Sequence, residues 1–308
     1  MHPAFSVIFF TVSSGAGLGL FALLVLADLF GLGGGLSRQA ILLPGVLAFF
    51  LVAGGFISST FHLANPKNAW RAVARFRTSW LSREGVFGLL FFPFAFCYLA
   101  LTWLAPESWQ PLRFVFGLGS LLLSWAAIFS TGMIYACLKT IRQWNTPLTP
   151  ANYVILGHAS GAMLLLAFLP TGERGLFLNV TVALLLAAAL LKAIYYYWID
   201  APNVSPTINT ATGFTRAGVK LLDQGHTHGT FLTQEFGFQV ARKYRLILKT
   251  LVFLVGFIYP LTILLGKPTQ SDVVLAAMSA LFGLVMERWL FFAEARHVVN
   301  LYHGAQRC

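Results

Sequence analysis

Charged residues are scarce in this chain of 308 residues, because Asp, Glu, Lys and Arg together make up only 10% of it while 57% is hydrophobic. An ordinary soluble domain carries about 25% charged residues. So few charges cannot cover a soluble surface, which excludes a soluble enzyme and a disordered chain. The formal net charge of +11 belongs to the loops, and we predict no nucleic-acid partner.

Cysteine is also scarce, and its spacing excludes two kinds of metal site. Cys97, Cys137 and Cys308 show no CxxC pattern, so we expect no iron–sulfur cluster and no zinc site within this chain. Cys97 lies inside an apolar run, and we expect no disulfide. Residues 1–5 contain no Lys or Arg, and the apolar run that follows is too long for a cleaved signal peptide.

Long apolar runs dominate what is present. A run of about 18 or more residues with almost no charge is typical of a transmembrane helix, which rises 1.5 Å per residue. The sequence therefore predicts an all-α, polytopic membrane protein that forms a single domain over residues 1–308. The eight candidate spans cover residues 5–31, 40–62, 84–105, 112–138, 150–170, 175–198, 246–266 and 272–292.

Positive charge is divided unevenly between the two predicted sides. An even number of spans places both termini on one side, and cytoplasmic segments are the ones rich in Lys and Arg. With a cytoplasmic N-terminus, 17 of the 21 Lys and Arg residues belong to the inner side, Lys192 and Arg288 among them. We therefore predict that both termini are cytoplasmic. The outer side keeps only Arg38, Arg113, Arg174 and Lys267.

Three predicted cytoplasmic loops, at about 63–83, 139–149 and 199–245, are the places where a soluble partner could bind. The third mixes Asn, Thr, Gly, His and charged residues, a composition that does not suit lipid. It is a solvated loop, a segment covered by another protein, or a segment that folds over the bundle, and loops of this length are usually functional or disordered. Gly15, Gly17 and Gly19 lie inside the first apolar run, where they predict close helix packing rather than a phosphate loop.

His62 and Glu84 are the first candidates for chemistry. They lie at the end of the second span and the start of the third, so the topology places both at the cytoplasmic membrane boundary. An imidazole and a carboxylate there can exchange protons near neutral pH. The alternative is that His62 bonds to a loop carbonyl while Glu84 caps its helix beside Arg83.

His158, Glu287 and Arg288 are secondary candidates, because ionisable side chains inside spans are costly and often functional. His158 lies about two turns into the fifth span, where it is either an interhelical hydrogen-bond donor or a ligand. Glu287 and Arg288 lie inside the last span and must pair with other groups. They either lock this helix to its neighbours or transfer protons. Asp28, near the outer end of the first span, is expected to meet water.

Five sequence segments carry a resemblance to a known family. Residues 62–72 read HLANPKNAWRA and residues 79–84 read SWLSRE, with MIYACLKTI, WNTPLTP and ERWLFFAEARH at 133–141, 144–150 and 287–297. The chain resembles the membrane-anchor subunits of DMSO-reductase-type molybdoenzymes, whose motif reads approximately HLGxPxRAW followed by SWLSREG. Ala64 stands where the family commonly has Gly, and Asn68 where it commonly has a charged residue.

The resemblance implies an eight-helix anchor in a bacterial inner membrane, without haem or iron–sulfur clusters of its own. Such an anchor exchanges electrons between membrane quinone and a ferredoxin-like subunit with four [4Fe–4S] clusters, which connects to a molybdopterin catalytic subunit. The family associates the motif's His and Glu with quinone, and these match His62 and Glu84. We add Arg83 as a group that could stabilise charge on a quinone oxygen, and Trp70, Arg71, Arg75 and Trp80 as partner-docking residues.

The predicted orientation favours one branch of this family. A quinone-facing loop in the cytoplasm resembles the sulfite-oxidising branch, in which a sulfite dehydrogenase delivers electrons to quinone. The same topology would serve an anchor of a quinol-oxidising reductase for DMSO or a related acceptor. Two other classes compete: a secondary transporter, for which inverted repeats would argue, and a haem-b cytochrome, which would need two opposed histidines.

Overall fold

The structure is a computed structural model that describes residues 4–61, 65–104, 106–200, 206–214, 216–223, 228 and 244–307. Within these residues, eight helices are long and apolar enough to span a membrane, which confirms the predicted number. They are α1 Phe5–Leu29, α2 Arg38–Thr60, α3 Trp80–Leu104, α4 Gln110–Ala136, α5 Leu148–Phe168, α6 Gly175–Asp200, the span Arg245–Leu264 and α12 Gln270–Ala293.

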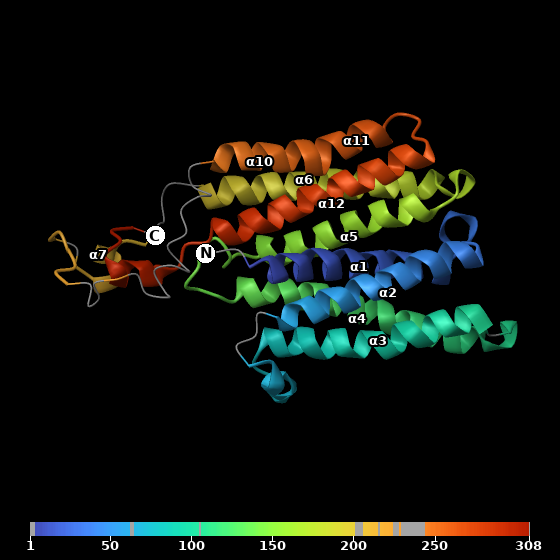
Figure 1. Cartoon of the computed structure of the whole chain (residues 1–308), viewed down its shortest axis with the longest axis horizontal. Coiled ribbons are helices and arrows are strands. Elements are labelled where there is room, and N and C mark those ends of the chain that lie inside the picture. Colours follow the sequence, from blue (N-terminus) through green and yellow to red (C-terminus); the bar gives the residue numbers. More distant parts are fainter. Residues whose placement is uncertain are drawn as a thin grey trace.

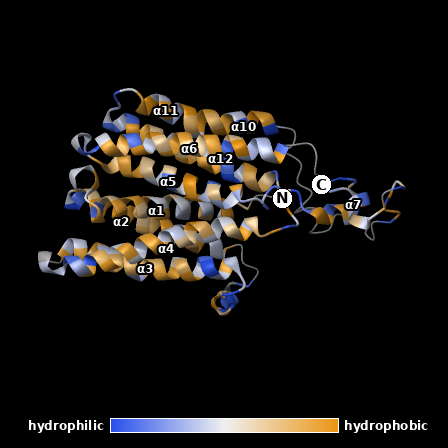
Figure 2. Ribbon diagram, turned by 180° about the vertical axis from the view of Figure 1, so that it is seen from behind, coloured by the Kyte–Doolittle hydropathy of each residue, from blue (hydrophilic) through white to orange (hydrophobic). Residues whose placement is uncertain are grey.

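The spans form one bundle in which α1 is the central helix. It packs against α2, α4, α5 and α12, while α3 and α6 lie further out (Figure 1). Helix α1 begins and α12 ends at the same end of the bundle, which we call the terminal end (Figure 1). Hydrophobic residues cover the length of the bundle and hydrophilic ones collect at its ends (Figure 2), as a surface that faces lipid requires.

Short helices lie outside the bundle at its terminal end. The 3-10 helix η2, Pro66–Arg75, precedes α3, and α7, Ile208–Thr212, packs against η6, Val298–His303. Two isolated antiparallel bridges, Ile141 with His297 and Thr207 with Arg307, join the loops that follow α4 and α6 to the segment after α12. The last of the three predicted loops is therefore folded against the C-terminal segment where the structure describes it.

Glycines bring α1 and α5 into backbone contact, as the Gly15–Gly19 segment predicts. A Cβ atom added to Gly19 would lie 2.0 Å from the carbonyl oxygen of Gly157, and one added to Gly161 would lie 2.2 Å from the Leu20 nitrogen. No side chain fits at these positions. Close approach of this kind is how helices associate where lipid surrounds them.

Replacing Gly19 with Ala should therefore destabilise the bundle by about 1–3 kcal/mol or more, because the new methyl group must push the two backbones apart. Gly15→Ala is the matched control, since a Cβ at Gly15 meets nothing within 4 Å. Thermal unfolding in detergent measures both. Equal midpoints for the two variants would contradict the contact.

The seventh span contains a π-helical segment. Residues Arg245–Phe253 form α10, Leu254–Ile258 form the π-helix η5, and Tyr259–Leu264 form α11. Gly256 in η5 faces Gly283 of α12, where a Cβ on Gly283 would lie 2.2 Å from the Gly256 Cα atom. The hydroxyl of Ser279 donates to the Val255 carbonyl at 2.7 Å. The irregular turn is thus held against α12, and π-bulges of this kind are frequent at functional sites.

Asp28 is enclosed at the end opposite the terminal end. Its Oδ2 atom accepts a hydrogen bond of 2.6 Å from the Tyr98 hydroxyl and pairs with Arg113, and only 9% of its side chain is exposed. The expectation that Asp28 meets water stays a prediction, because its side chain is mostly enclosed but still lines a polar cavity. Its ion pair and hydrogen bond tie α1 to α3 and α4, beside a polar cavity of about 210 Å³.

Candidate functional site

Glu84 is buried in the bundle near the terminal end, with 3% of its surface exposed. Its Oε1 atom accepts a hydrogen bond of 2.5 Å from the hydroxyl of Thr131 on α4. Helix α3 begins at Trp80, so Glu84 lies beyond the first turn, which contains no acidic residue. The interpretation of Glu84 as a helix cap is therefore wrong. Thr131 was missed because a Thr in an apolar run carries no signal of its own.

His62, the predicted partner of Glu84, lies outside the described residues, so their pairing stays a prediction. The two helices that carry these residues do meet at this level. A Cβ atom on Gly88 of α3 would lie 2.2 Å from the ring of Phe56 on α2. Phe56 precedes His62 by six positions and Gly88 follows Glu84 by four. The end of α2 and the start of α3 are therefore neighbours.

The side chain of Arg83 is hydrogen-bonded to the loop before α3. Its guanidinium donates to the carbonyl oxygens of Phe76 at 3.0 Å and Arg77 at 2.8 Å, and it lies 4.1 Å from the Trp80 ring centroid. These contacts hold the turn between η2 and α3. They point the guanidinium at the loop while Glu84 points into the bundle, and the sequence alone could not distinguish the two directions.

The predicted docking residues divide into two groups. Trp70, Arg71 and Arg75 are exposed on η2, and we call them the η2 patch; Trp70 is 70% exposed, with the Arg71 guanidinium 5.6 Å from its ring centroid. Trp80 is partly buried and packs edge-on against Phe129 of α4 at 5.8 Å. The η2 patch is thus open to a partner, while Trp80 helps to fix α3 on α4.

His158 accepts one interhelical hydrogen bond and forms a second one within its own helix, so the expectation of an interhelical donor is wrong. Its Nε2 atom accepts from the Trp125 indole at 2.9 Å, and its Nδ1 atom lies 2.7 Å from the Val154 carbonyl oxygen. Both ring nitrogens are therefore engaged, which leaves no lone pair for haem iron. Within the described residues, no group of three or more His, Cys, Asp or Glu side chains could hold a metal ion.

Glu287 and Arg288 are fully buried and form a cluster with Lys192 of α6. Glu287 is 1% exposed, Arg288 2% and Lys192 1%. The Glu287 carboxylate pairs with the Lys192 ammonium and accepts a 2.5 Å hydrogen bond from the Arg288 Nε atom. The cluster joins α6 to α12. Lys192 was missed as a site residue, because the charge count assigned it to the inner side.

A second group of charges lies where α6, α10 and α12 end or begin. The Lys249 ammonium lies 3.0 Å from the Asp200 carboxylate and 3.1 Å from that of Glu294. Arg245 pairs with Asp200 at 3.1 Å. Burial raises the pKa of Glu294 above its ordinary value, and the neighbouring Lys249 offsets part of that rise. This group is open to solvent through Asp200, whose side chain is 39% exposed.

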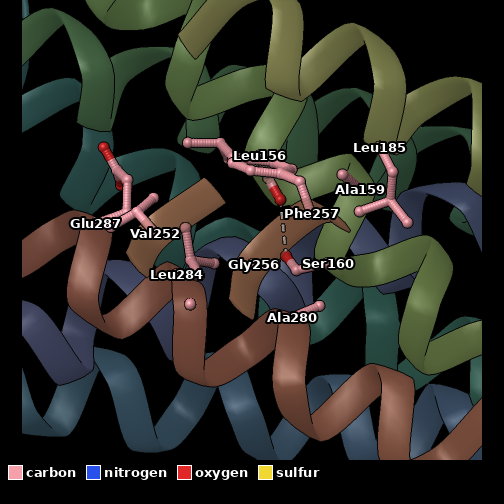
Figure 3. Close-up of a pocket in the computed structure, with 11 residues that line it drawn as sticks. Leu156, Ala159, Ser160, Leu185, Val252, Gly256, Phe257, Ala280, Leu284 and Glu287 are labelled. Carbon is pink, nitrogen blue, oxygen red and sulfur yellow. Dashed lines mark hydrogen bonds between the residues drawn. The ribbon is translucent and has the colours of Figure 1, made fainter. Parts of the chain in front are cut away.

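A small cavity adjoins the buried cluster. It lies between α5, α6, η5 and α12, has a volume of about 20 Å³, and has Glu287 at one end (Figure 3). That volume has room for one water molecule. Ser160 also lines it, with its hydroxyl donating to the Leu156 carbonyl. Among the described residues, Glu287 is the only charged side chain along its wall.

The fold and these sites describe a helical membrane protein with buried ionisable groups near one end. The chain matches the family described as DMSO reductase anchor subunit (DmsC) over residues 1–293, and it belongs to that family. It is 35% identical to a protein named as a sulfite dehydrogenase subunit from Allochromatium vinosum, over 98% of this chain and 99% of that protein. The chain is thus an anchor subunit of an oxidoreductase complex, as the sequence motifs indicate.

Proposed function

We propose that this chain is the quinone-reactive anchor of a molybdopterin oxidoreductase complex. It passes electrons between a ferredoxin-like iron–sulfur subunit and membrane quinone, in a bacterial inner membrane with the partner subunits on the cytoplasmic side. The observation that carries the proposal is the buried Glu84 carboxyl group near the terminal end of a chain of the anchor family. An ionisable group buried inside a membrane span is costly, which makes this carboxyl group a candidate for chemistry.

The residues around Glu84 suit a quinone headgroup as substrate. Reduction of quinone to quinol takes up two electrons and two protons, so the site needs a proton donor, hydrogen bonds for two ring oxygens and an apolar slot. Glu84 and Thr131 supply an acid and a hydroxyl at 2.5 Å from each other. Phe87, whose ring packs edge-on against Phe76 at 5.6 Å, and the exposed Phe61 offer the apolar walls. His62 would bond the second oxygen.

Sulfite is the substrate we propose for the catalytic subunit, with electrons flowing from sulfite to quinone. The similarity to a protein named as a sulfite dehydrogenase subunit supports this direction, and so does the predicted cytoplasmic side of the terminal end. The alternative is an anchor of a quinol-oxidising reductase for DMSO or a related acceptor, which the family description favours equally.

The test compares membranes that contain the whole complex with membranes from a strain that lacks this chain. Sulfite-dependent reduction of quinone should occur only in the first. Quinol-dependent reduction of DMSO in its place would establish the reverse direction. If both activities persist when the chain is removed, its quinone-reactive role is contradicted.

The η2 patch should contribute to docking of the iron–sulfur partner. Replacing Trp70 with Ala is expected to weaken the complex by about 2 kcal/mol, because Trp and Arg residues that become buried dominate interface energy. Trp103→Ala is the matched control, since Trp103 is 64% exposed at the other end of α3. The amount of iron–sulfur subunit that co-purifies with the affinity-purified anchor measures the effect of both substitutions. Equal recovery of the partner for the two variants would contradict a role of the η2 patch in docking.

A further inference from the structure

The buried cluster on α6 and α12 holds more charge than helix locking needs. One carboxylate, that of Glu287, pairs with two cations, Lys192 and Arg288. Each of the three residues has only 1–2% of its surface exposed. Charges enclosed this completely cost more to bury than their attraction returns, and apolar residues of similar size would join the two helices at least as well. Their presence therefore calls for a function.

Aromatic side chains lead from this cluster to α4, the helix whose Thr131 donates to Glu84. The Arg288 guanidinium lies 4.1 Å from the Tyr153 ring centroid, and the Tyr153 ring stacks on Tyr135 at 5.6 Å with an interplanar angle of 16°. Tyr135 follows Thr131, the hydrogen-bond donor to Glu84, by four positions on α4, so the two side chains lie on the same face of that helix. Arginine keeps its proton throughout, so Arg288 can orient these groups but cannot relay. The tyrosine hydroxyls can donate and accept.

Another aromatic side chain connects the cluster to solvent. Tyr196 lies between two lysines, with its ring centroid 5.0 Å from the Lys192 nitrogen and 4.6 Å from the Lys249 nitrogen. Its hydroxyl is buried and has no hydrogen-bond partner within the described part of the chain. Lys249 in turn pairs with Asp200 and Glu294, the solvent-facing group described above.

We propose that Glu287, Lys192, Tyr196 and Lys249 form a proton-transfer route from the surface at Asp200 toward Glu84. The route presupposes the quinone site proposed above and supplies its protons. Quinone accepts two electrons from the reduced iron–sulfur partner and two protons delivered along this chain of side chains, giving quinol. Each proton taken from Glu84 is replaced through Tyr135 and Tyr153 from the Glu287 cluster, and the cluster is recharged from water through Lys249.

Two side-chain features favour proton transfer, rather than the joining of helices alone, as the function of this cluster. An unpartnered buried hydroxyl such as that of Tyr196 lowers stability, so it is unexplained if the cluster only holds helices together. The carboxyl of Glu294 is buried beside Lys249 at the entrance, where its raised pKa brings proton exchange closer to neutral pH. The small cavity beside Glu287 leaves room for one water molecule to assist transfer.

The test is Tyr196→Phe in the complete complex, with Tyr195→Phe as matched control. The Tyr195 hydroxyl donates to the Gln143 carbonyl at 3.0 Å, so it is fixed and outside the route. We expect Tyr196→Phe to slow quinone-coupled turnover by about tenfold or more and to raise its solvent deuterium isotope effect. Small weak acids should restore part of the rate. Electron transfer to a soluble artificial acceptor should stay unchanged.

A second variant guards against an effect of packing alone. Lys192→Met combined with Glu287→Gln leaves the net charge of the cluster at +1, and it should also slow quinone turnover with rescue by weak acids. Equal turnover for Tyr196→Phe and Tyr195→Phe would overturn the route, as would a loss that weak acids never rescue. If Glu84→Gln slows quinone-coupled turnover while both route variants turn over quinone normally, the proton-transfer route is contradicted and the quinone site is not. If Glu84→Gln also turns over quinone normally, the proposed quinone site is contradicted.

Discussion

Replacing Glu84 with Gln is expected to lower quinone-coupled turnover by about 10²- to 10⁴-fold, the usual contribution of a positioned general acid or base. The amide keeps the shape of the side chain and can still accept from the Thr131 hydroxyl, but it cannot carry a proton. Assembly and the reduction of a soluble acceptor through the partner's clusters should be unaffected. Steady-state assays with a short-chain quinone and with the soluble acceptor measure the two rates.

Two variants at Thr131 sharpen this prediction. Thr131→Ser keeps the hydroxyl that donates to Glu84, whereas Thr131→Val removes it at nearly constant volume. Quinone turnover should fall in the valine variant and stay near normal in the serine variant. If Glu84→Gln turns over quinone normally, the site lies elsewhere, and Glu287 is the next candidate because it is the other fully buried carboxylate in a described span.

The largest effect on stability is expected at Glu287. Glu287→Met removes the carboxylate that pairs with both Lys192 and Arg288, and an unpaired buried charge costs about 3–5 kcal/mol. Met has nearly the volume of Glu, so the loss reflects charge rather than a cavity. Thermal unfolding of the purified complex in detergent measures it.

A triple variant is the control for this cost. Replacing Lys192, Glu287 and Arg288 with Met together removes every charge of the cluster, and an apolar replacement of a whole charged group is often neutral or stabilising. The triple variant should therefore be more stable than Glu287→Met alone. A triple variant no more stable than the single one would show that the ion pairs themselves hold α6 to α12.

The helices could be read from the sequence because the requirement for apolar runs of membrane thickness leaves few alternatives. Their ends lie within two residues of the expected positions, except that α3 begins at Trp80 rather than at residue 84. Ser82 and Arg83 caused this difference, because polar residues at a membrane boundary suggest a loop. Arg83 instead stays in the helix while its long side chain reaches back to loop carbonyls.

The partners of the buried groups could not be predicted. Lys192 stands alone in an apolar run, and its pairing with Glu287 depends on how α6 and α12 rotate about their own axes, which composition does not fix. The hydrogen bond from Thr131 to Glu84 depends in the same way on α3 and α4. Sequence identified Glu84, Glu287 and Arg288 as ionisable groups that are costly to bury but missed Lys192, and packing decided which of these groups meet.

The most direct test is to reduce the iron–sulfur clusters of the purified complex and mix it rapidly with a short-chain quinone while following cluster absorbance. We expect the clusters to become oxidised as fast as steady-state turnover requires when this chain is present. The catalytic and iron–sulfur subunits without this chain should stay reduced over the same time. Cluster oxidation by quinone at the same rate with and without this chain would contradict its role as the quinone-reactive subunit.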